Sequence, residues 1–341
     1  MRVLITGSQG YIGTHLTYHL GKLGYKVFGV DSGFFKSCNV TPIKEDSSTL
    51  QRDIRDMEKD DFVDFDVVIH LAALSNDPIG ELDSKLTFEI NHEGAVRVAQ
   101  LAKAAGVKRF VFISTQSIYG ISKTDKELDE IDSIKNPQTA YAQSKWKAEQ
   151  EILSMSDVVF ATTALRPSTV FGWSPRFRSD IVFNNLILNG LLKQRIEVHS
   201  DGTPWRPIIH VQDVCIAIQK CLELSVESIS SKAFNLGVQN GNYTVKELAE
   251  AAQSCLNGLP ILYNTENLTD PRSYKVSFNR AFRELDFDAK IDLISGGNEI
   301  AKEARILLDA GVNLLSRKTN RLQQVKYLLE NGSLDDTLRF R

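Results

Sequence analysis

A short apolar strand followed by evenly spaced glycines constrains this chain more than any other feature. Residues 2–6 are apolar enough to form a buried strand. Three glycines then follow at intervals of three residues: Gly7, Gly10 and Gly13. An amphipathic segment over 11–23 predicts a helix, and a second apolar strand over 26–30 ends in Asp31. This order of strand, glycine loop, helix, strand and acid is typical of a dinucleotide-binding unit.

Each part of this unit has a physical role. Gly7 can adopt the backbone angles of a tight turn, Gly10 lets the backbone approach a pyrophosphate, and Gly13 lets the helix pack closely on the strand. The start of the helix supplies N–H groups for the phosphates. Asp31 would accept hydrogen bonds from the adenosine ribose and repel a 2′-phosphate, which predicts NAD(H) rather than NADP(H). Alternatively, the glycines could serve packing alone in an ordinary strand–helix–strand turn.

Composition excludes several classes of function. The 341 residues suggest about two domains, and 42% hydrophobic with 24% charged residues is typical of a globular protein. A net charge of −3 gives no electrostatic reason to expect nucleic acid or a membrane surface as partner. No apolar run approaches the ~20 residues of a membrane span. The four cysteines show no metal-binding or redox spacing, and the chain opens directly on a strand, so we expect a cytoplasmic protein with reduced thiols and no metal.

Strands and helices alternate through the first half of the chain. We expect strands over 66–71, 109–114 and 158–165, and helices over 83–105 and 139–155. This alternation predicts an α/β fold, a Rossmann-like doubly wound parallel sheet with helices on both faces.

The pattern loosens after residue 167, where a smaller substrate-binding part is expected to be interleaved with the first. Residues 234–236 are expected to form a strand that returns to the main sheet. We therefore expect three parts: a dinucleotide-binding domain of 1–170 plus about 207–237, a second, substrate-binding domain of 171–206 plus about 238–310, and a C-terminal helical extension of 311–341.

One tyrosine–lysine pair stands out as a candidate for chemistry. Tyr141 and Lys145 lie one helical turn apart, and a nearby ammonium would lower the pKa of the tyrosine so that it could act as a general base. The same spacing occurs at 18/22 and 119/123, but only Tyr141 begins a helix that follows the hydroxyl cluster of 114–117 at a strand end. Ligands of open parallel sheets bind at such ends. The alternative is a surface pair.

The chain resembles the extended short-chain dehydrogenase/reductase family, and within it the NAD-dependent nucleotide-sugar epimerases and dehydratases. The resemblance runs from about residue 2 to 274. It rests on these motifs: Thr6-Gly7-x-x-Gly10-x-x-Gly13, His70-Leu71-Ala72-Ala73, Asn91, Ser114-Thr115-Gln116-Ser117-Ile118-Tyr119-Gly120, Tyr141-x-x-x-Lys145, Leu165-Arg166-Pro167, Asn184-Asn185 and Arg206-Pro207-Ile208-Ile209-His210-Val211-x-Asp213.

The resemblance implies roles for individual residues. Tyr141 would remove the proton from a sugar hydroxyl, Lys145 would hold the nicotinamide ribose, and Thr115 would bond the same sugar oxygen. The implied cofactor-binding residues are Gly7, Gln9, Gly10, Tyr11, Ile12, Gly13, Asp31, Asp53, Ile54, Leu71, Ala72, Ala73, Asn91, Ser114, Lys145 and Pro167. The implied substrate-binding residues are Thr115, Gln116, Ser117, Tyr141, Thr169, Arg176, Asn184, Asn185, Arg206 and Arg272.

Some of these substrate residues have plainer interpretations. Arg206 matches the family's diphosphate-binding arginine, a role suited to a permanently charged fork. Asn184 and Asn185 could instead cap a helix or lie on the surface, and Arg272 could be an ordinary surface arginine. Arg178 is expected beside Arg176 at the sugar.

The sequence departs from the family's 4,6-dehydratases immediately after the candidate threonine. Those enzymes carry a pair of acids there, whereas this chain has Gln116 and Ser117, so water elimination is not expected. We therefore expect NAD-dependent oxidation of a nucleotide-diphosphate sugar at C4, with net 4-epimerisation through a 4-keto intermediate. A net 4-dehydrogenase or 4-ketoreductase would use the same residues. A non-catalytic NAD-binding sensor on this fold is a further alternative.

Relatives commonly form homodimers through a four-helix bundle. Here the bundle would use the helices of 83–105 and 139–155 from each subunit. It needs an apolar outer stripe, for which we expect Ala95, Val98, Ala102 and Ala105 to serve.

Overall fold

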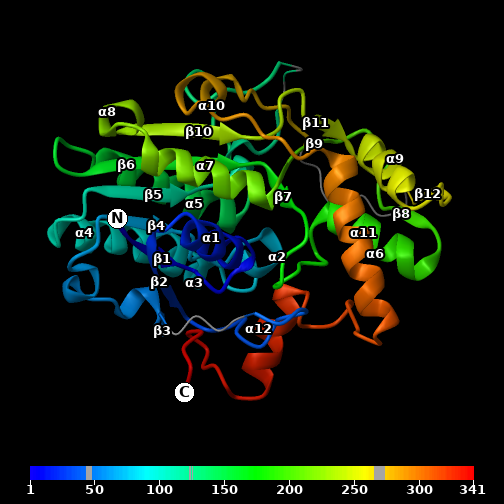
Figure 1. The fold of residues 1–341 in the computed structure, drawn as a ribbon, viewed down its shortest axis with the longest axis horizontal. Coiled ribbons are helices and arrows are strands. Elements are labelled where there is room, and N and C mark those ends of the chain that lie inside the picture. Colours follow the sequence, from blue (N-terminus) through cyan, green and yellow to red (C-terminus); the bar gives the residue numbers. More distant parts are fainter. Residues whose placement is uncertain (44–47, 123, 125, 265–272) are drawn as a thin grey trace.

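A seven-stranded parallel sheet forms the centre of the computed structural model, which describes residues 1–43, 48–122, 124, 126–264 and 273–341 (Figure 1). The strand order is β10-β6-β5-β4-β1-β2-β3. Its strands are β1 (Arg2–Thr6), β2 (Lys26–Asp31), β3 (Thr49–Gln51), β4 (Val67–His70), β5 (Arg109–Ile113), β6 (Ala161–Pro167) and β10 (Lys232–Leu236). The predicted Rossmann-like fold is confirmed, and so is the late strand that returns to the main sheet.

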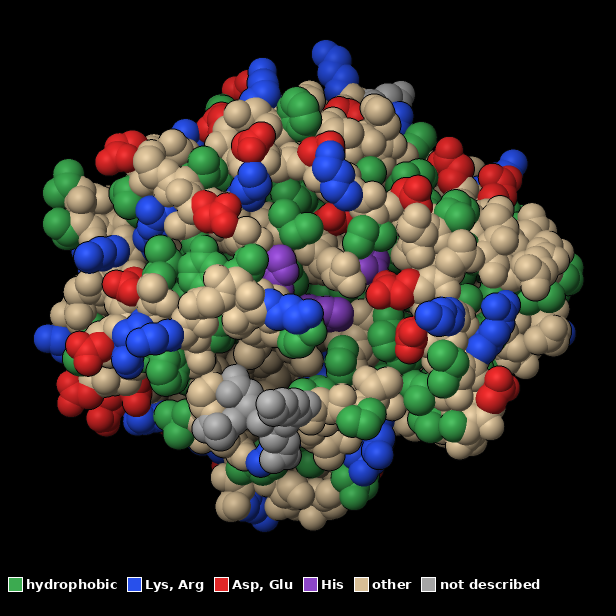
Figure 2. Space-filling model, viewed as in Figure 1, with side chains coloured by type: hydrophobic (Ala, Val, Ile, Leu, Met, Phe, Trp, Pro, Cys, Tyr) green, Lys and Arg blue, Asp and Glu red, His purple; other side chains and the backbone are tan. Residues whose placement is uncertain are grey.

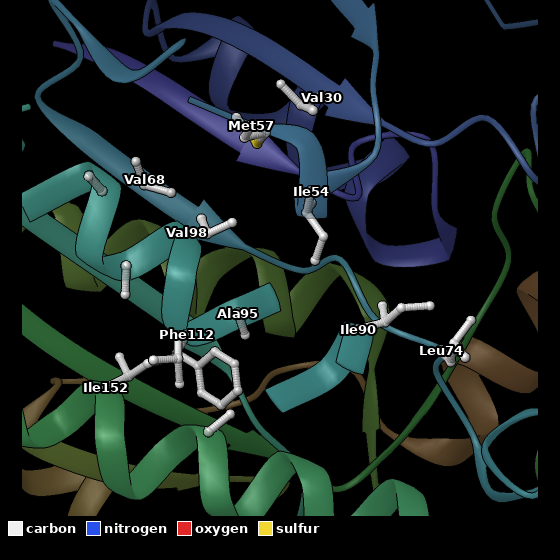
Figure 3. Close-up of a cluster of buried hydrophobic side chains, with 14 of the residues drawn as sticks. Val30, Ile54, Met57, Val68, Leu74, Ile90, Ala95, Val98, Phe112 and Ile152 are labelled. Atoms are coloured by element: carbon white, nitrogen blue, oxygen red, sulfur yellow. The ribbon is translucent and has the colours of Figure 1, made fainter. Parts of the chain in front are cut away.

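The sheet is buried on both faces because its strands are apolar at nearly every position. Leu4, Val68 and Phe110 point into one core, and alternate residues such as Ile5 and Ile69 point into the other. The first core, shown in Figure 3, is covered by the long helix that consists of α3, η3 and α4, and by α5. The second is covered by α1 and α7. The bounds of these helices are α1 (Tyr11–Lys22), α3 (Ser84–Phe88), η3 (Glu89–Gly94, a π-helical stretch), α4 (Ala95–Ala104), α5 (Ala140–Ser154) and α7 (Val211–Glu223).

Two predicted elements differ from the observed ones. The helix expected over 83–105 is present, but it contains the π-helical stretch η3 between α3 and α4. The strand expected to begin at Val158 begins at Ala161. The reason is a turn in which the carboxylate of Asp157 accepts hydrogen bonds from the N–H groups of Val159 and Phe160, at 2.9 Å each.

The stripe expected to form a dimer bundle does not face outward. Ala95, Val98 and Ala102 are fully buried in the first core, against the sheet. A single apolar stripe cannot cover the sheet and also serve a partner subunit. The expectation about this stripe is therefore wrong. Homodimerisation itself stays a prediction.

A smaller unit beside the main sheet has its own core. Its helices α6 (Val182–Lys193), α9 (Val245–Cys255) and α11 (Leu293–Asp309) pack on one another, seen on the right of Figure 1. A three-stranded sheet is formed by β7 (Thr169–Phe171), β9 (Trp205–His210) and β11 (Asn242–Thr244). β8 (Ile196–Val198) pairs with β12 (Ile261–Tyr263). The remaining short elements are η1 (Ile54–Asp56), η2 (Lys59–Phe62), α2 (Asp77–Gly80), η4 (Gln116–Tyr119), α8 (Val226–Ile229) and α10 (Asn279–Glu284).

The C-terminal extension turns back along the first domain. Its helix α12 (Arg321–Glu330) lies below α2 in Figure 1. Val325 and Leu328 of this helix enter the first core. The side-chain amide of Gln324 donates to the carbonyl of Phe34, just after β2, at 3.0 Å. The extension therefore packs against the N-terminal half of the chain.

Acidic and basic side chains are interspersed on the face of the molecule drawn in Figure 2. The four cysteines are buried free thiols. Among the residues that the structure describes, no helix is long and apolar enough to cross a membrane.

Two glycines of α1 predict opposite effects of the same substitution. A Cβ at Gly13 would lie 2.2 Å from the carbonyl oxygen of Gly7, whereas a Cβ at Gly21 would meet nothing within 4 Å. We expect Gly13→Ala to lower the free energy of unfolding by about 1–3 kcal/mol through overpacking. Gly21→Ala should raise it by about 0.5–1 kcal/mol, because alanine favours the helix. Urea unfolding checks both, and equal effects would contradict the packing argument.

Candidate active site

A large cavity opens at the carboxyl ends of the central strands, where the strand order reverses between β1 and β4. Its volume is about 1000 Å³, enough for a dinucleotide together with a second ligand. Most of the sequence-predicted residues line it: Gly7, Gly10, Tyr11, Ile12, Gly13, Asp31, Asp53, Ile54, Leu71, Ala72, Ala73, Ser114, Thr115, Gln116, Ser117, Tyr141, Lys145, Pro167, Thr169 and Arg206.

The glycine loop has the close packing that the sequence predicts. Gly7 has a φ of 75°, and a Cβ there would lie 2.7 Å from the backbone nitrogen of Ala72. The N–H of Gly7 donates to the carbonyl of Val30 at 2.7 Å. The loop is thereby held between the ends of β2 and β4. Because both neighbours are backbone, only glycine fits.

The start of α1 fits a phosphate group. Gly10 is its N-cap and supplies no side chain to bond the N–H groups of the first turn. Those groups, together with the positive end of the helix, can bind an anion. The residues present therefore fit the diphosphate of a dinucleotide.

Asp31 lines the cavity beside the glycine loop. Its two carboxylate oxygens accept hydrogen bonds from the N–H groups of Gln9 (2.9 Å) and Gly33 (2.8 Å). Burial raises the pKa of Asp31, and these two bonds oppose the increase. The bond to Gln9 ties the carboxylate to the glycine loop, so both lie at one end of the cavity.

The start of α5 brings Tyr141 to the cavity. Thr139 caps the helix by accepting from the N–H of Ala142, and its hydroxyl donates to Asp77 of α2 at 2.5 Å. A Cβ on Gly80 of α2 would lie 2.9 Å from the Cβ of Tyr141. α2 therefore fixes the first turn of α5. No pattern in the sequence indicates this contact.

Lys145 is an almost fully buried cation. It is 2% exposed, and its Nζ lies 4.0 Å from the centroid of the Phe112 ring. Burial lowers its pKa to about 7. Burial and the charge of Lys145 lower the pKa of His70 to about 3, so this histidine is neutral at physiological pH. The Nδ1 of His70 is bonded to the hydroxyl of Thr6 at 2.8 Å, whereas its Nε2 is buried without a hydrogen-bond partner among the described residues.

Gln116 is held by two backbone carbonyls. Its amide nitrogen donates to the carbonyl oxygens of Arg166 and Leu236, at 3.0 Å each. These two bonds use both N–H groups of the amide. The amide oxygen, Oε1, is buried and has no hydrogen-bond partner among the described residues. The group after Thr115 is thus a neutral acceptor, with no proton to exchange.

The arginines expected at the substrate differ in where they lie. Arg206, on β9, lines it together with Arg178, and Arg178 is paired with Asp180 at 2.9 Å. Arg176 does not line the cavity. Its guanidinium donates to the carbonyl oxygens of Gln9 (2.5 Å) and Phe35 (3.1 Å). It therefore holds the glycine loop in place.

Four further expected residues are committed to the fold and do not line the cavity. Asn184 is fully buried and bonds Gly172 and the carbonyl of Arg178, and Asn185 donates to the carbonyl of Ser179. Asn91 bonds both backbone groups of Leu74, at 2.7 and 3.2 Å. The remaining one is Gln9, whose backbone groups bond Asp31 and Arg176. Arg272 lies outside the described residues.

The sequence missed several residues of the cavity wall. They come from loops and from the C-terminal extension: Ser32, Phe34, Phe35, Asp180, Asn320, Arg321 and Leu322. No local pattern marks them, because tertiary packing alone brings these segments to the site.

Comparisons with known proteins agree with this geometry. The model of the NAD dependent epimerase/dehydratase family matches residues 3–237. The chain belongs to this family. It is therefore an enzyme of the NAD-dependent nucleotide-sugar type, a member of the extended short-chain dehydrogenase/reductases.

Individual relatives in the family differ in reaction. The chain is 29% identical to the UDP-glucose 4-epimerase of Bacillus subtilis, over 85% of this chain and 93% of that protein. It is 27% identical to UDP-glucuronic acid decarboxylase 2 of Arabidopsis thaliana, over 89% of this chain and 68% of that protein. The structure of MoeE5 in complex with UDP-glucose and NAD is 28% identical, with a TM-score of 0.77, covering 90% of this chain and all of that one.

No group of three or more histidine, cysteine or acidic side chains that could hold a metal occurs in the described part of this family member.

Replacing Lys145 should stabilise this epimerase/dehydratase family member. Since its native pKa of about 7 lies below the lysine value of 10.5, protonating Lys145 costs folding free energy. The cost is complete below pH 7 and shrinks by about 1.4 kcal/mol per pH unit as the pH rises toward 10.5. We expect Lys145→Met to unfold at higher urea concentration than the unmodified protein at pH 6, with a smaller difference at pH 9.

The exposed Lys147 of the same helix provides the control. Lys147→Met should show no such pH-dependent gain. A constant difference between Lys145→Met and the unmodified protein from pH 6 to pH 9 would contradict the charge argument.

Proposed function

We propose that this enzyme oxidises a nucleotide-diphosphate sugar at C4 and inverts that carbon, a net 4-epimerisation. The observation that carries the proposal is the placement of Thr115, Tyr141 and Lys145 on the wall of the cavity that also contains the glycine loop and Asp31. The known activities of the family supply the class of substrate. NAD⁺, when bound, supplies the hydride acceptor.

In this proposal Tyr141 removes the proton from the C4 hydroxyl. The ammonium of Lys145, in a buried site where charges interact strongly, stabilises the phenolate and holds the nicotinamide ribose. Thr115 donates a hydrogen bond to the C4 oxygen and keeps it in place. Arg206 and Arg178, which line the same cavity, hold the diphosphate and the sugar. The 4-keto sugar then takes hydride back on its opposite face.

The residues after Thr115 argue against water elimination from the sugar. Elimination needs a group that gives or takes a proton near C6. The amide nitrogen of Gln116 is used by two carbonyls, and an amide cannot act as an acid at neutral pH. Ser117, the next residue, carries only a hydroxyl. The oxidised sugar is therefore expected to keep its C6 oxygen.

Incubation with UDP-glucose, UDP-galactose and UDP-glucuronic acid tests the reaction. UDP-sugars come first because the relatives named above act on them. Products are followed by ¹H NMR and NADH by absorbance near 340 nm. C4 interconversion without NADH accumulation supports the epimerase. Stoichiometric NADH would instead identify a net dehydrogenase, and loss of the C6 carboxylate as CO₂ would identify a decarboxylase.

Tyr141→Phe should reduce kcat by about 10²–10⁴-fold, because it removes the general base. NAD⁺ binding, measured by calorimetry, should change little. The matched control is Tyr18→Phe, since Tyr18 has the same spacing to a lysine but is 65% exposed on α1. Full activity in Tyr141→Phe would contradict the assignment of Tyr141 as the general base.

We propose further that the protein works as a cytoplasmic homodimer. Free buried thiols suit a reducing compartment. Sedimentation equilibrium at micromolar concentration checks the oligomeric state. A mass of 38.2 kDa would identify a monomer and contradict the proposal.

A further inference from the structure

The N-terminus of α12 forms part of the cavity wall although it lies more than three hundred residues from the glycine loop. Asn320, Arg321 and Leu322 all line the cavity. Asn320 caps the helix by accepting from the N–H of Gln323 at 3.1 Å. Just before the helix, the carbonyl of Thr319 accepts from the N–H of Ser179 at 2.9 Å. The C-terminal extension is thus fixed against the loop that covers the glycine loop.

Arg321 is the buried cation of this helix end. It is 2% exposed, its Nη2 donates to the carbonyl of Arg176 at 3.0 Å, and its guanidinium lies 4.3 Å from the centroid of the Phe35 ring. Its Nη1 is buried and has no hydrogen-bond partner among the described residues. No carboxylate of the described chain forms an ion pair with it. Burial lowers its pKa to about 10, which still leaves it charged at neutral pH.

A buried guanidinium with an unused donor is costly unless an anion accepts from it. The surroundings favour an anion from two sides. The N-termini of α1 and α12 both line the same cavity, and each presents the positive end of a helix. These observations indicate a binding site for a phosphate group between the two helices.

The position of Arg321 favours the cofactor's diphosphate over that of the sugar nucleotide. Arg321 bonds the carbonyl of Arg176, and the guanidinium of Arg176 bonds the carbonyl of Gln9 in the glycine loop. Phe35, on which Arg321 stacks, follows Asp31 by four residues. Arg206, the candidate ligand of the sugar nucleotide, comes from β9 in the smaller unit.

We propose that Arg321 binds the diphosphate of the bound dinucleotide, so that the C-terminal extension completes the cofactor site. The glycine loop and the start of α1 hold the diphosphate from one side, and the guanidinium of Arg321 with the first turn of α12 holds it from the other. This inference is independent of which reaction follows at the sugar.

Binding measurements on single variants test the proposal. The variants are Arg321→Gln and Arg321→Lys, and the control is Arg317→Gln. Arg317 lies in the same extension and stacks on Tyr327 at 3.9 Å, but it does not line the cavity. Calorimetry on the full chain, freed of bound nucleotide, gives dissociation constants for NAD⁺, ADP, adenosine and UDP. The NAD content of the protein as purified is a second readout.

We expect the substitution to weaken the binding of only those ligands that carry the cofactor's phosphates. Arg321→Gln should raise the dissociation constants of NAD⁺ and ADP about 10- to 100-fold, which is the usual effect of losing a charge-assisted hydrogen bond. The dissociation constants of adenosine and UDP should not change. Arg321→Lys should be intermediate, since it keeps the charge but not the fork. Arg317→Gln should match the unmodified protein for all four ligands.

Three results would overturn the proposal. Weaker binding of UDP alone would assign Arg321 to the sugar nucleotide. An equal loss for all four ligands, adenosine included, would show that Arg321 only supports the fold. No change for any ligand would show that it binds nothing. If Arg321→Gln does not fold, Arg321→Lys decides, since unchanged affinity for NAD⁺ and ADP in that variant would exclude a forked contact.

Discussion

The backbone packing of the glycine loop is the constraint on which the rest of the site depends. Gly7 lies against the backbone of Ala72, and the carbonyl of Gly7 lies against Gly13, so the ends of β1 and β4 and the start of α1 are fixed together. The smaller unit is attached at the same place. The hydroxyl of Tyr11 donates to the carbonyl of Gly172 at 2.6 Å, and His15 is bonded to the carbonyl of Trp173 at 2.7 Å. The loop thus positions both halves of the cavity.

The features that sequence predicted well are those fixed by short-range contacts. A glycine loop, its helix and the following acid are joined by a few residues, so their arrangement follows from the sheet topology. Tyr141 and Lys145 share a helix, and their spacing determines that they share a face. Because parallel strands end at one edge, Ser114 and Thr115 could also be assigned to that edge.

The features that sequence could not predict depend on how each element is rotated or where a distant segment packs. Arg176 and Arg178 are two residues apart, yet one is used by the glycine loop and the other lines the cavity. A helical position such as Val98 can face either a partner subunit or the sheet, and in this structure Val98 packs against the sheet. Asn184 occupies the motif position, but its side-chain amide is hydrogen-bonded within the fold. It accepts from the N–H of Gly172 and donates to the carbonyl of Arg178.

The position of the C-terminal extension in the sequence determines when the cavity wall is completed during synthesis. A ribosome makes the glycine loop more than three hundred residues before it makes residues 320–322. The wall of the cavity is therefore incomplete on a nascent chain until these three residues have been made, however well its central sheet has formed. Arg341 lies near β3, on the side of the main sheet (Figure 1). A polypeptide fused there would extend from the segment that closes the cavity, whereas an N-terminal fusion would leave from the opposite end of β1.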